Sequence, residues 1–189
     1  MKILFISLGC DKNLADSEEM LGLLTGNGHE IVDSEEEADA IVINTCCFIH
    51  DAKEESVNTI LEMAEYKKTG TCKILIVTGC MAQRYKEEIT KEIPEVDAVL
   101  GTTSYGDIVK ALNEAEAGHV FQEFKDINAL PEDSGRRVIT TGGHFGYLKI
   151  AEGCDKHCTY CIIPSLRGKF RSVPEERLLK QAEYMASGN

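Results

Sequence analysis

Short apolar runs alternate with longer, more polar stretches over the first two thirds of the chain. Most of these runs are rich in isoleucine, valine and leucine, and each is short enough to be a single strand. The runs that predict strands are Lys2–Ser7, Ala40–Asn44, Lys73–Thr78, Ala98–Leu100 and His119–Phe124. Strands that alternate with helices are typical of an α/β fold, so the pattern predicts a parallel sheet.

The stretches between these runs carry helix start and stop signals. Asp16 followed by Glu19 resembles a capping box and predicts a helix that starts there and ends near Gly26. Glycine or proline follows each of the other predicted helices and explains where it ends. These helices are Asp51–Lys68, Ala82–Glu92 and Tyr105–Ala117.

The pattern changes after residue 128. Residues 129–143 include the run Pro131–Gly135 and the pair Gly142-Gly143, a composition that predicts a linker. A strand at Tyr147–Ala151 and a helix at Pro174–Ala186 are expected beyond it. One strand and one helix cannot bury the core of a barrel. We therefore expect residues 1–128 to form a complete α/β domain and residues 144–189 to form only the beginning of a second domain.

The chain has 189 residues and eight cysteines. A chain of this length can bury a sizeable core without disulfides. Its opening apolar run is too short for a secretory signal, and no run approaches the roughly 18 apolar residues of a membrane helix. The sequence therefore predicts a cytoplasmic protein that does not enter a membrane and whose cysteines serve a metal or catalysis.

Charge is unevenly distributed along the chain. Residues 1–134 contain 11 basic and 27 acidic side chains, a net charge of −16, whereas residues 135–189 contain nine basic and five acidic ones, a net charge of +4. Acidic faces often serve only solubility, but they also repel nucleic-acid phosphates. The charge therefore argues mildly against a nucleic-acid substrate.

Three cysteines follow three of the predicted strands at equivalent places. Cys10, Cys46 and Cys80 each come after a β-branched apolar run and a small or polar residue. The carboxyl ends of parallel strands meet at one edge of a sheet, so these thiols are expected to converge. Three thiolates suit a soft metal, and a cubane iron–sulfur cluster held by three cysteines keeps one iron free for another ligand.

The alternative is that small cysteines simply pack well near strand ends. Three equivalent placements favour a functional role over this alternative. Cys47 and Cys72 lack the placement, because one directly follows Cys46 and the other precedes a strand. We expect both to be packing residues.

Cys154, Cys158 and Cys161 form a Cys-x-x-x-Cys-x-x-Cys motif after a predicted strand. This spacing is that of radical-SAM enzymes, in which three thiolates hold a 4Fe–4S cluster and the fourth iron binds S-adenosylmethionine. A zinc site with His157 as fourth ligand is the alternative, but His157 lies between two of the cysteines and fits the usual zinc pairs poorly. Tyr160 matches the aromatic residue found against the adenine in radical-SAM enzymes.

With both cysteine triads in view, the chain resembles the methylthiotransferase family of radical-SAM enzymes over essentially its whole length. The matching segments are Gly9-Cys10-Asp11-Lys12-Asn13, Asp16-Ser17-Glu18, Asn44-Thr45-Cys46, Gly79-Cys80 with Gln83, Tyr147–Cys154, Ile162-Ile163-Pro164-Ser165 and Arg167-Gly168-Lys169. Asp11-Lys12 stands where the tRNA-modifying branch usually has Gln-Met. The chain is therefore more similar to the RimO-type branch, which modifies an aspartate of ribosomal protein S-twelve.

The resemblance implies two 4Fe–4S clusters and S-adenosylmethionine as cofactors. The cluster on Cys10, Cys46 and Cys80 would carry the sulfur that is methylated and transferred, and the cluster on the second triad would generate the radical that attacks the β-carbon of the aspartate. Such cofactors supply the chemistry while the protein supplies positioning. The implied partners are the ribosomal protein and an electron donor such as flavodoxin or ferredoxin, with no nucleic acid as substrate.

Family members are more than twice as long as this chain, since they complete the barrel and add a small substrate-binding domain. The resemblance therefore implies that these 189 residues alone are inactive. Two other functions stay open. One is a tRNA adenosine methylthiotransferase, and the other is a non-catalytic iron–sulfur or nucleotide-binding module, although no glycine-rich phosphate loop follows the first strand.

Overall fold

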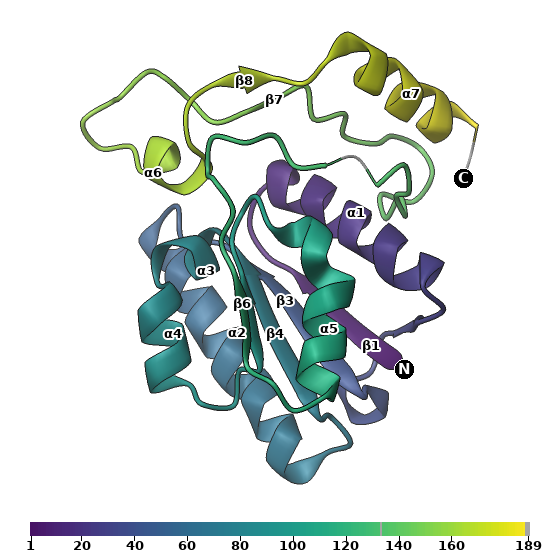
Figure 1. Ribbon diagram of the computed structural model, residues 1–189, viewed down its shortest axis with the longest axis vertical. Coiled ribbons are helices and arrows are strands. Elements are labelled where there is room, and N and C mark those ends of the chain that lie inside the picture. The colour runs from purple at the N-terminus through teal and green to yellow at the C-terminus, as the bar shows by residue number, and fades with distance from the viewer. Residues whose placement is uncertain (133, 188–189) are drawn as a thin grey trace.

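The computed structural model describes residues 1–132 and 134–187 (Figure 1). Asp133 of the expected linker and residues 188–189 of the expected second domain lie outside the described residues. Two parts are visible in Figure 1. A sheet with helices on both sides occupies the lower part, and the segment from about residue 126 onward crosses above it.

The first part is a six-stranded sheet in the order β2-β1-β3-β4-β5-β6, and every neighbouring pair is parallel. This arrangement confirms the predicted parallel α/β fold. The strands are β1 (Lys2–Ser7), β2 (Glu30–Val32), β3 (Ala40–Thr45), β4 (Ile74–Gly79), β5 (Ala98–Leu100) and β6 (Phe121–Glu123). The sequence pattern missed β2, a short and partly exposed edge strand.

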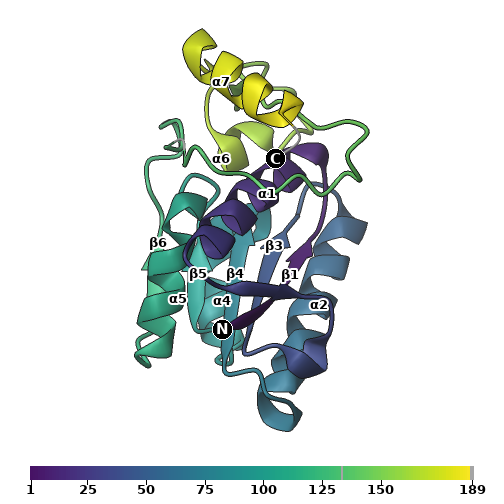
Figure 2. The same cartoon turned by 90° about the vertical axis from the view of Figure 1, so that its right-hand side faces the viewer.

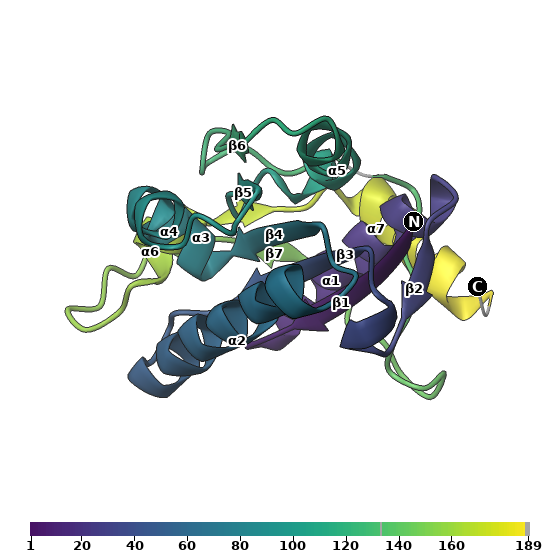
Figure 3. The same cartoon turned by 90° about the horizontal axis from the view of Figure 1, so that it is seen from below.

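Helices cover both faces of this sheet (Figures 2 and 3). Helices α1 (Asp11–Gly26) and α5 (Ile108–Glu116) pack on one face, while α2 (His50–Thr69), α3 (Cys80–Arg84) and α4 (Lys86–Glu92) pack on the other. An apolar core lies on each face of the sheet, and strand β3 contributes to both. Ile41 and Ile43 point to the α2 side, while Ala40 and Val42 point to the α1 side. Successive strand residues alternate between the faces of a sheet, and burial on both faces explains the continuous apolar runs.

The predicted start of the first helix is wrong. Helix α1 begins at Asp11, directly after Cys10, and no side chain caps it. Asp16 and Glu19 are buried in the body of the helix. Asp16 binds Lys149 and Arg167, and Glu19 accepts a hydrogen bond from Tyr105 at 3.2 Å. The carboxylates therefore serve tertiary ion pairs and hydrogen bonds instead of a helix cap.

Three other predicted elements have different bounds. The helix expected over Ala82–Glu92 is two short helices, because Tyr85 leaves the helical conformation between α3 and α4. The helix expected over Tyr105–Ala117 opens with a 3-10 turn, η2 (Tyr105–Asp107), before α5. The strand expected over His119–Phe124 is only the three residues of β6. A second 3-10 turn, η1 (Glu35–Glu37), precedes β3.

The second part contains strands β7 (Ala151–Glu152) and β8 (Arg171–Ser172), which pair antiparallel, and helices α6 (Ile163–Arg167) and α7 (Glu175–Ala186). Helix α7 agrees with the prediction. The strand expected over Tyr147–Ala151 is not formed: only Ala151 belongs to a strand, because β8 offers just two residues for pairing. Figure 1 shows this part above the edge where the strands of the sheet end.

The described part of the chain contains no helix that is both long enough and apolar enough to span a bilayer.

Candidate functional site

The three strand-end cysteines line one cleft at the carboxyl edge of the sheet. Cys10 follows β1, Cys46 follows β3 directly, and Cys80 follows β4 and opens α3. All three line a cleft of about 850 Å³. The strand order reverses between β1 and β3, and such a switch point is where open α/β sheets place their ligands. The predicted convergence of the three cysteines on one edge is therefore what the structure has.

Two glycines let the cysteine-bearing loops approach one another. Gly9 and Gly79 precede Cys10 and Cys80, and both have a left-handed backbone, with φ of 96° and 93°. A β-carbon at Gly9 would lie 2.9 Å from the sulfur of Cys46, and one at Gly79 would lie 2.5 Å from the carbonyl oxygen of Thr45. Any larger residue would collide at either position, so the Gly-Cys sequence is a condition for this packing.

The three thiols differ in exposure. Cys10 is exposed, whereas Cys46 and Cys80 retain 5% and 6% of their surface. Burial raises the pKa of the Cys80 thiol, and the nearby guanidinium of Arg167 opposes that rise. Within residues 1–132 and 134–187, no three histidine, cysteine, aspartate or glutamate side chains are close enough together to hold a metal ion. The thiols thus share a cleft without forming a closed ligand cage.

The donor set nevertheless fits a cluster held by three thiolates. Cysteine sulfur is the soft ligand that iron–sulfur clusters require, and three such side chains line this one cleft.

Cys47 and Cys72 are buried in the apolar core on the α2 side of the sheet, to which Cys80 also belongs. The Cys47 thiol donates to the Cys80 carbonyl at 3.3 Å, and the Cys72 thiol donates to the Ile74 carbonyl at 3.3 Å. Burial raises the pKa of the Cys47 thiol to about 11 and also raises that of Cys72. Neither thiol lines the cleft in which Cys10, Cys46 and Cys80 meet.

The second triad lies on the loop that joins β7 to α6. Cys158 is exposed, Cys154 and Cys161 are half-buried, and the Tyr160 side chain is 90% exposed. The Cys161 amide donates to the Cys158 carbonyl at 3.0 Å, and the Cys154 amide donates to the Gly168 carbonyl at 3.0 Å. These bonds define the turn that carries the motif. As with the first triad, the described residues do not bring the three thiols into a group that could hold a metal ion.

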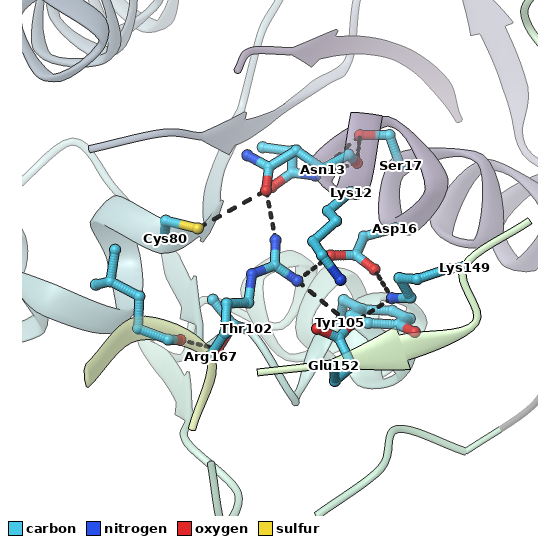
Figure 4. A network of polar contacts seen from close by, with 12 residues as sticks. Lys12, Asn13, Asp16, Ser17, Cys80, Thr102, Tyr105, Lys149, Glu152 and Arg167 are labelled. Carbon is cyan, nitrogen blue, oxygen red and sulfur yellow. Dashed lines mark hydrogen bonds and ion pairs between the residues drawn. The ribbon is translucent and has the colours of Figure 1, made fainter. Parts of the chain in front are cut away.

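A buried network of charges joins the two parts of the chain (Figure 4). Asp16 on α1 binds the Lys149 ammonium on one carboxylate oxygen and Arg167 Nη1 on the other, the latter at 2.7 Å. Glu152 on β7 lies 2.7 Å from the same ammonium and 3.5 Å from Arg167 Nη1. Its oxygens lack well-aligned hydrogen bonds, so Glu152 acts in this network mainly through its charge. Two carboxylates and two cations therefore balance in the interior.

The ion pairs set the charge states of these groups. Burial by itself would raise the pKa of Asp16, but Lys149 and Arg167 hold it below its ordinary value. Burial would likewise lower the pKa of Lys149, but Asp16, Tyr105 and Glu152 together outweigh this effect and raise it. Asp16 and Lys149 are therefore ionised at neutral pH.

Asn13 connects this network to all three cysteine-bearing strand ends. Its amide nitrogen donates to the Leu8 carbonyl at 3.0 Å and to the Thr45 carbonyl at 2.9 Å. Its oxygen accepts from Arg167 Nη2 at 2.5 Å and lies 3.8 Å from the sulfur of Cys80 (Figure 4). One fully buried side chain thus contacts the loops before Cys10 and Cys46 and the third cysteine itself.

Sequence reasoning assigned no site role to Asn13, Lys149, Glu152 or Arg167, and it interpreted Asp16 as part of a helix cap. One signal was available: Asn13 and Asp16 are spaced i and i+3, so they share one face of a helix that follows a candidate ligand. Their partners lie more than 130 positions away, and no local pattern identifies contacts at that separation.

The fold and the site define a class: a parallel-sheet domain with flavodoxin-like strand order and three cysteines in a cleft at its switch point. The chain belongs to the family described as "Uncharacterized protein family UPF0004", whose family model matches residues 2–101.

Relatives extend the similarity over the whole chain. The chain is 64% identical over 188 residues to a protein of Lachnoclostridium phytofermentans named "Ribosomal protein uS12 methylthiotransferase RimO", covering 100% of this chain and 43% of the relative. Proteins with the same name from Clostridioides difficile and Trichlorobacter lovleyi are 50% and 48% identical over 98% and 99% of this chain, and 42% of each relative is covered. The chain thus spans less than half the length of these curated relatives.

Proposed function

We propose that this chain belongs to a radical-SAM methylthiotransferase that adds a methylthio group to the β-carbon of an aspartate in a small-subunit ribosomal protein. The observation that carries the proposal is the cleft in which Cys10, Cys46 and Cys80 meet. Residues of helix α6, which follows the second triad in sequence, also line this cleft. The similarity to relatives named for methylthiolation of protein uS12 supports the same reaction and substrate.

Each triad has one role in this proposal. Cys10, Cys46 and Cys80 hold an auxiliary 4Fe–4S cluster, and Cys154, Cys158 and Cys161 hold the radical-SAM cluster beside which Tyr160 contacts the adenine of S-adenosylmethionine. When bound, these groups supply the sulfur and the radical chemistry that an unactivated C–H bond requires.

The residues of the chain itself orient the reaction and exclude water. Ile163, Leu166 and Arg167 of α6 line the cleft of the first triad, although they follow the second triad in sequence. Holding reacting groups close together in a shielded site is the main contribution that a protein makes to such chemistry. Helix α6 thus links the second triad in sequence to the cleft of the first.

The proposed ribosomal target and an electron donor such as flavodoxin or ferredoxin imply a cytoplasmic protein.

Metal analysis of the anaerobically reconstituted chain tests the two sites. Wild-type protein should bind two 4Fe–4S clusters. Replacing Cys10, Cys46 and Cys80 together by Ala should remove one cluster, and replacing Cys154, Cys158 and Cys161 should remove the other. Cys47→Ser and Cys72→Ser are matched controls that should keep the wild-type iron and sulfide content. Unchanged iron in either triple variant would refute that ligand set.

The substrate is tested with a full-length protein that carries this segment. Mass spectrometry should find the added methylthio group on the aspartate of the ribosomal protein and none on tRNA adenosine. A modified tRNA with an unmodified ribosomal protein would instead support the tRNA-modifying branch. The 189-residue chain alone should hold clusters but not turn over, because it spans less than half of the relatives and the remaining substrate contacts would be missing.

The strand order also suits a second candidate, a flavin-binding module, since flavodoxin-like domains bind their cofactor at the same switch point. The cysteines in the cleft argue against it. A visible spectrum of the purified protein with flavin bands and without iron–sulfur absorption would favour this module.

A further inference from the structure

Arg167 reaches from the second part of the chain into the cleft of the first cysteine triad. It ends α6, a helix that starts two residues after Cys161, and it lines the cleft together with Cys10, Cys46 and Cys80. Its side chain retains only 4% of its surface. A guanidinium at such a depth keeps its charge and acts in a medium that screens it poorly.

The two ends of the guanidinium have different partners. Nη1 binds Asp16 at 2.7 Å and lies 3.5 Å from Glu152, so the carboxylates are on one side. Nη2 donates to the Asn13 oxygen, which in turn faces the sulfur of Cys80 (Figure 4). The carboxylates thus fix the orientation of the guanidinium, and its other end is directed toward the cysteine site.

The other cations of the region are placed differently. Lys149 is nearly as buried as Arg167, with 9% against 4% of its side-chain surface exposed, but it binds Asp16 and Glu152, lies over the Tyr105 ring and does not line the cleft. Lys12 lines the cleft but is exposed, and its ammonium donates to the Ala151 carbonyl at 2.7 Å. Water therefore screens the charge of Lys12, and Arg167 is the cation with both burial and proximity to the thiols.

We propose that Arg167 is a positioning residue for the three-cysteine site: through Asn13 it fixes the three strand ends, and its buried charge raises the reduction potential of the cluster held there. This inference rests on the proposed function. The potential of an iron–sulfur cluster depends on nearby charge and on hydrogen bonds around its ligands, because reduction adds a negative charge to the site. A fixed cation favours the reduced state.

The test isolates the first cluster. In the full 189-residue chain, Cys154, Cys158 and Cys161 are replaced by Ala, and the protein is reconstituted anaerobically. Three further variants are made in this background: Arg167→Gln, Arg167→Lys and Lys149→Met. Iron and sulfide content is measured for each, and the midpoint potential is measured by a redox titration followed by electron paramagnetic resonance.

We expect the background protein to hold one cluster. Arg167→Gln should shift its potential to more negative values and lower its iron occupancy. Arg167→Lys keeps the charge but cannot reach both Asp16 and Asn13, so its shift should have the same sign and be smaller. Lys149→Met removes a nearly as deeply buried cation from the same network but not from the cleft, so its shift should be smaller than that of Arg167→Gln.

The outcomes separate this inference from the function on which it rests. A background protein that binds no iron would refute the ligand set itself. A background protein with a cluster whose potential is the same in both Arg167 variants would overturn only the role of Arg167. An equal shift from Lys149→Met would also overturn that role, since the effect would then come from general loosening of the fold. Where Arg167→Gln does not fold, an unchanged potential in Arg167→Lys is sufficient to reject the inference.

Discussion

Glu18 and Arg137 form a buried ion pair between helix α1 and the segment that follows strand β6. Arg137 donates from Nε and Nη2 to one carboxylate oxygen of Glu18, at 2.8 and 2.6 Å. The Arg137 side chain is 5% exposed and the Glu18 side chain is 0% exposed. The other oxygen of Glu18 accepts from the amide and hydroxyl of Thr140, at 2.7 and 2.9 Å. Arg137 and Thr140 therefore bind the expected linker, residues 129–143, to helix α1.

Breaking this pair should destabilise the fold. Glu18→Gln or Arg137→Met leaves one buried charge without its partner, which typically costs about 3–5 kcal/mol of unfolding free energy. Urea unfolding of each variant measures the loss. Glu65→Gln is the control, because Glu65 pairs with Lys68 on the surface and exposed pairs contribute little. Equal losses in Glu65→Gln and Glu18→Gln would show that the segment is not held through Glu18.

Gly9→Ala should disrupt the first cysteine site. The new β-carbon would lie 2.7 Å from the β-carbon of Cys46, on a backbone with φ of 96° that other residues rarely adopt. The loops of Cys10 and Cys46 must then separate, so iron occupancy of the first triad should fall. The measurement is iron content after reconstitution of the chain without Cys154, Cys158 and Cys161.

Gly28→Ala provides the control for backbone strain. Gly28 has a similar φ of 83°, but nothing lies within 4 Å of an added β-carbon. It should cost about 1–2 kcal/mol from the left-handed backbone and leave iron content unchanged. If Gly9→Ala keeps its iron as fully as Gly28→Ala does, close approach of the two loops is not required for the site.

Asp16 should make stability depend on pH in the acid range. Its pKa in the folded chain is below the ordinary value of 3.8, because its pairs with Lys149 and Arg167 outweigh the effect of burial. The unfolded chain therefore takes up the proton first as the pH falls. The stabilisation from this carboxylate is complete above its unfolded pKa and is lost as the pH falls through its folded pKa.

Comparison with Asp16→Asn isolates this contribution. The variant should be less stable than wild type at neutral pH by about 3–5 kcal/mol, and the difference should narrow below pH 3.8 as the wild-type carboxylate is protonated. Urea unfolding across this pH range gives the difference. If the difference in unfolding free energy between the two proteins stayed constant down to the pH of acid unfolding, the charge of Asp16 would not contribute to stability.

The sheet and the first site could be predicted because their signals are local. β1 and β5 have the predicted bounds, β3 is one residue longer than predicted, and β4 is shifted by one residue at both ends. A buried parallel strand is a continuous apolar run, and parallel strands bring their carboxyl ends to one edge whatever the sequence between them. The common location of Cys10, Cys46 and Cys80 follows from those two facts.

The network around Asp16 could not be predicted, because its signals are not local. Ion pairs between distant segments depend on how those segments dock, and a polar residue within a helix is equally consistent with a solvated face. Asp16 followed by Glu19 matched a capping box, a local motif, and the match was wrong because tertiary partners used both carboxylates. Tyr147–Ala151 failed as a strand for a related reason: strand pairing needs a partner, and β8 extends over only two residues.

Helix α6 should contribute to the stability of the first domain although it belongs to the second part of the chain. Leu166 retains 1% of its surface and belongs to the same apolar core as Cys80, Met81 and Val99. Thr102 donates to the Leu166 carbonyl at 2.8 Å and fixes the end of the helix over β5.

Leu166→Ala leaves a cavity in this core and should lower the unfolding free energy by about 2–5 kcal/mol. Leu179→Ala is the matched control, because Leu179 on α7 is 56% exposed and surface changes typically stay within about 0.5 kcal/mol. Urea unfolding of both variants decides the point. Equal stability of the two would mean that α6 does not dock on the sheet, and the positioning role of Arg167 would lose its support at the same time.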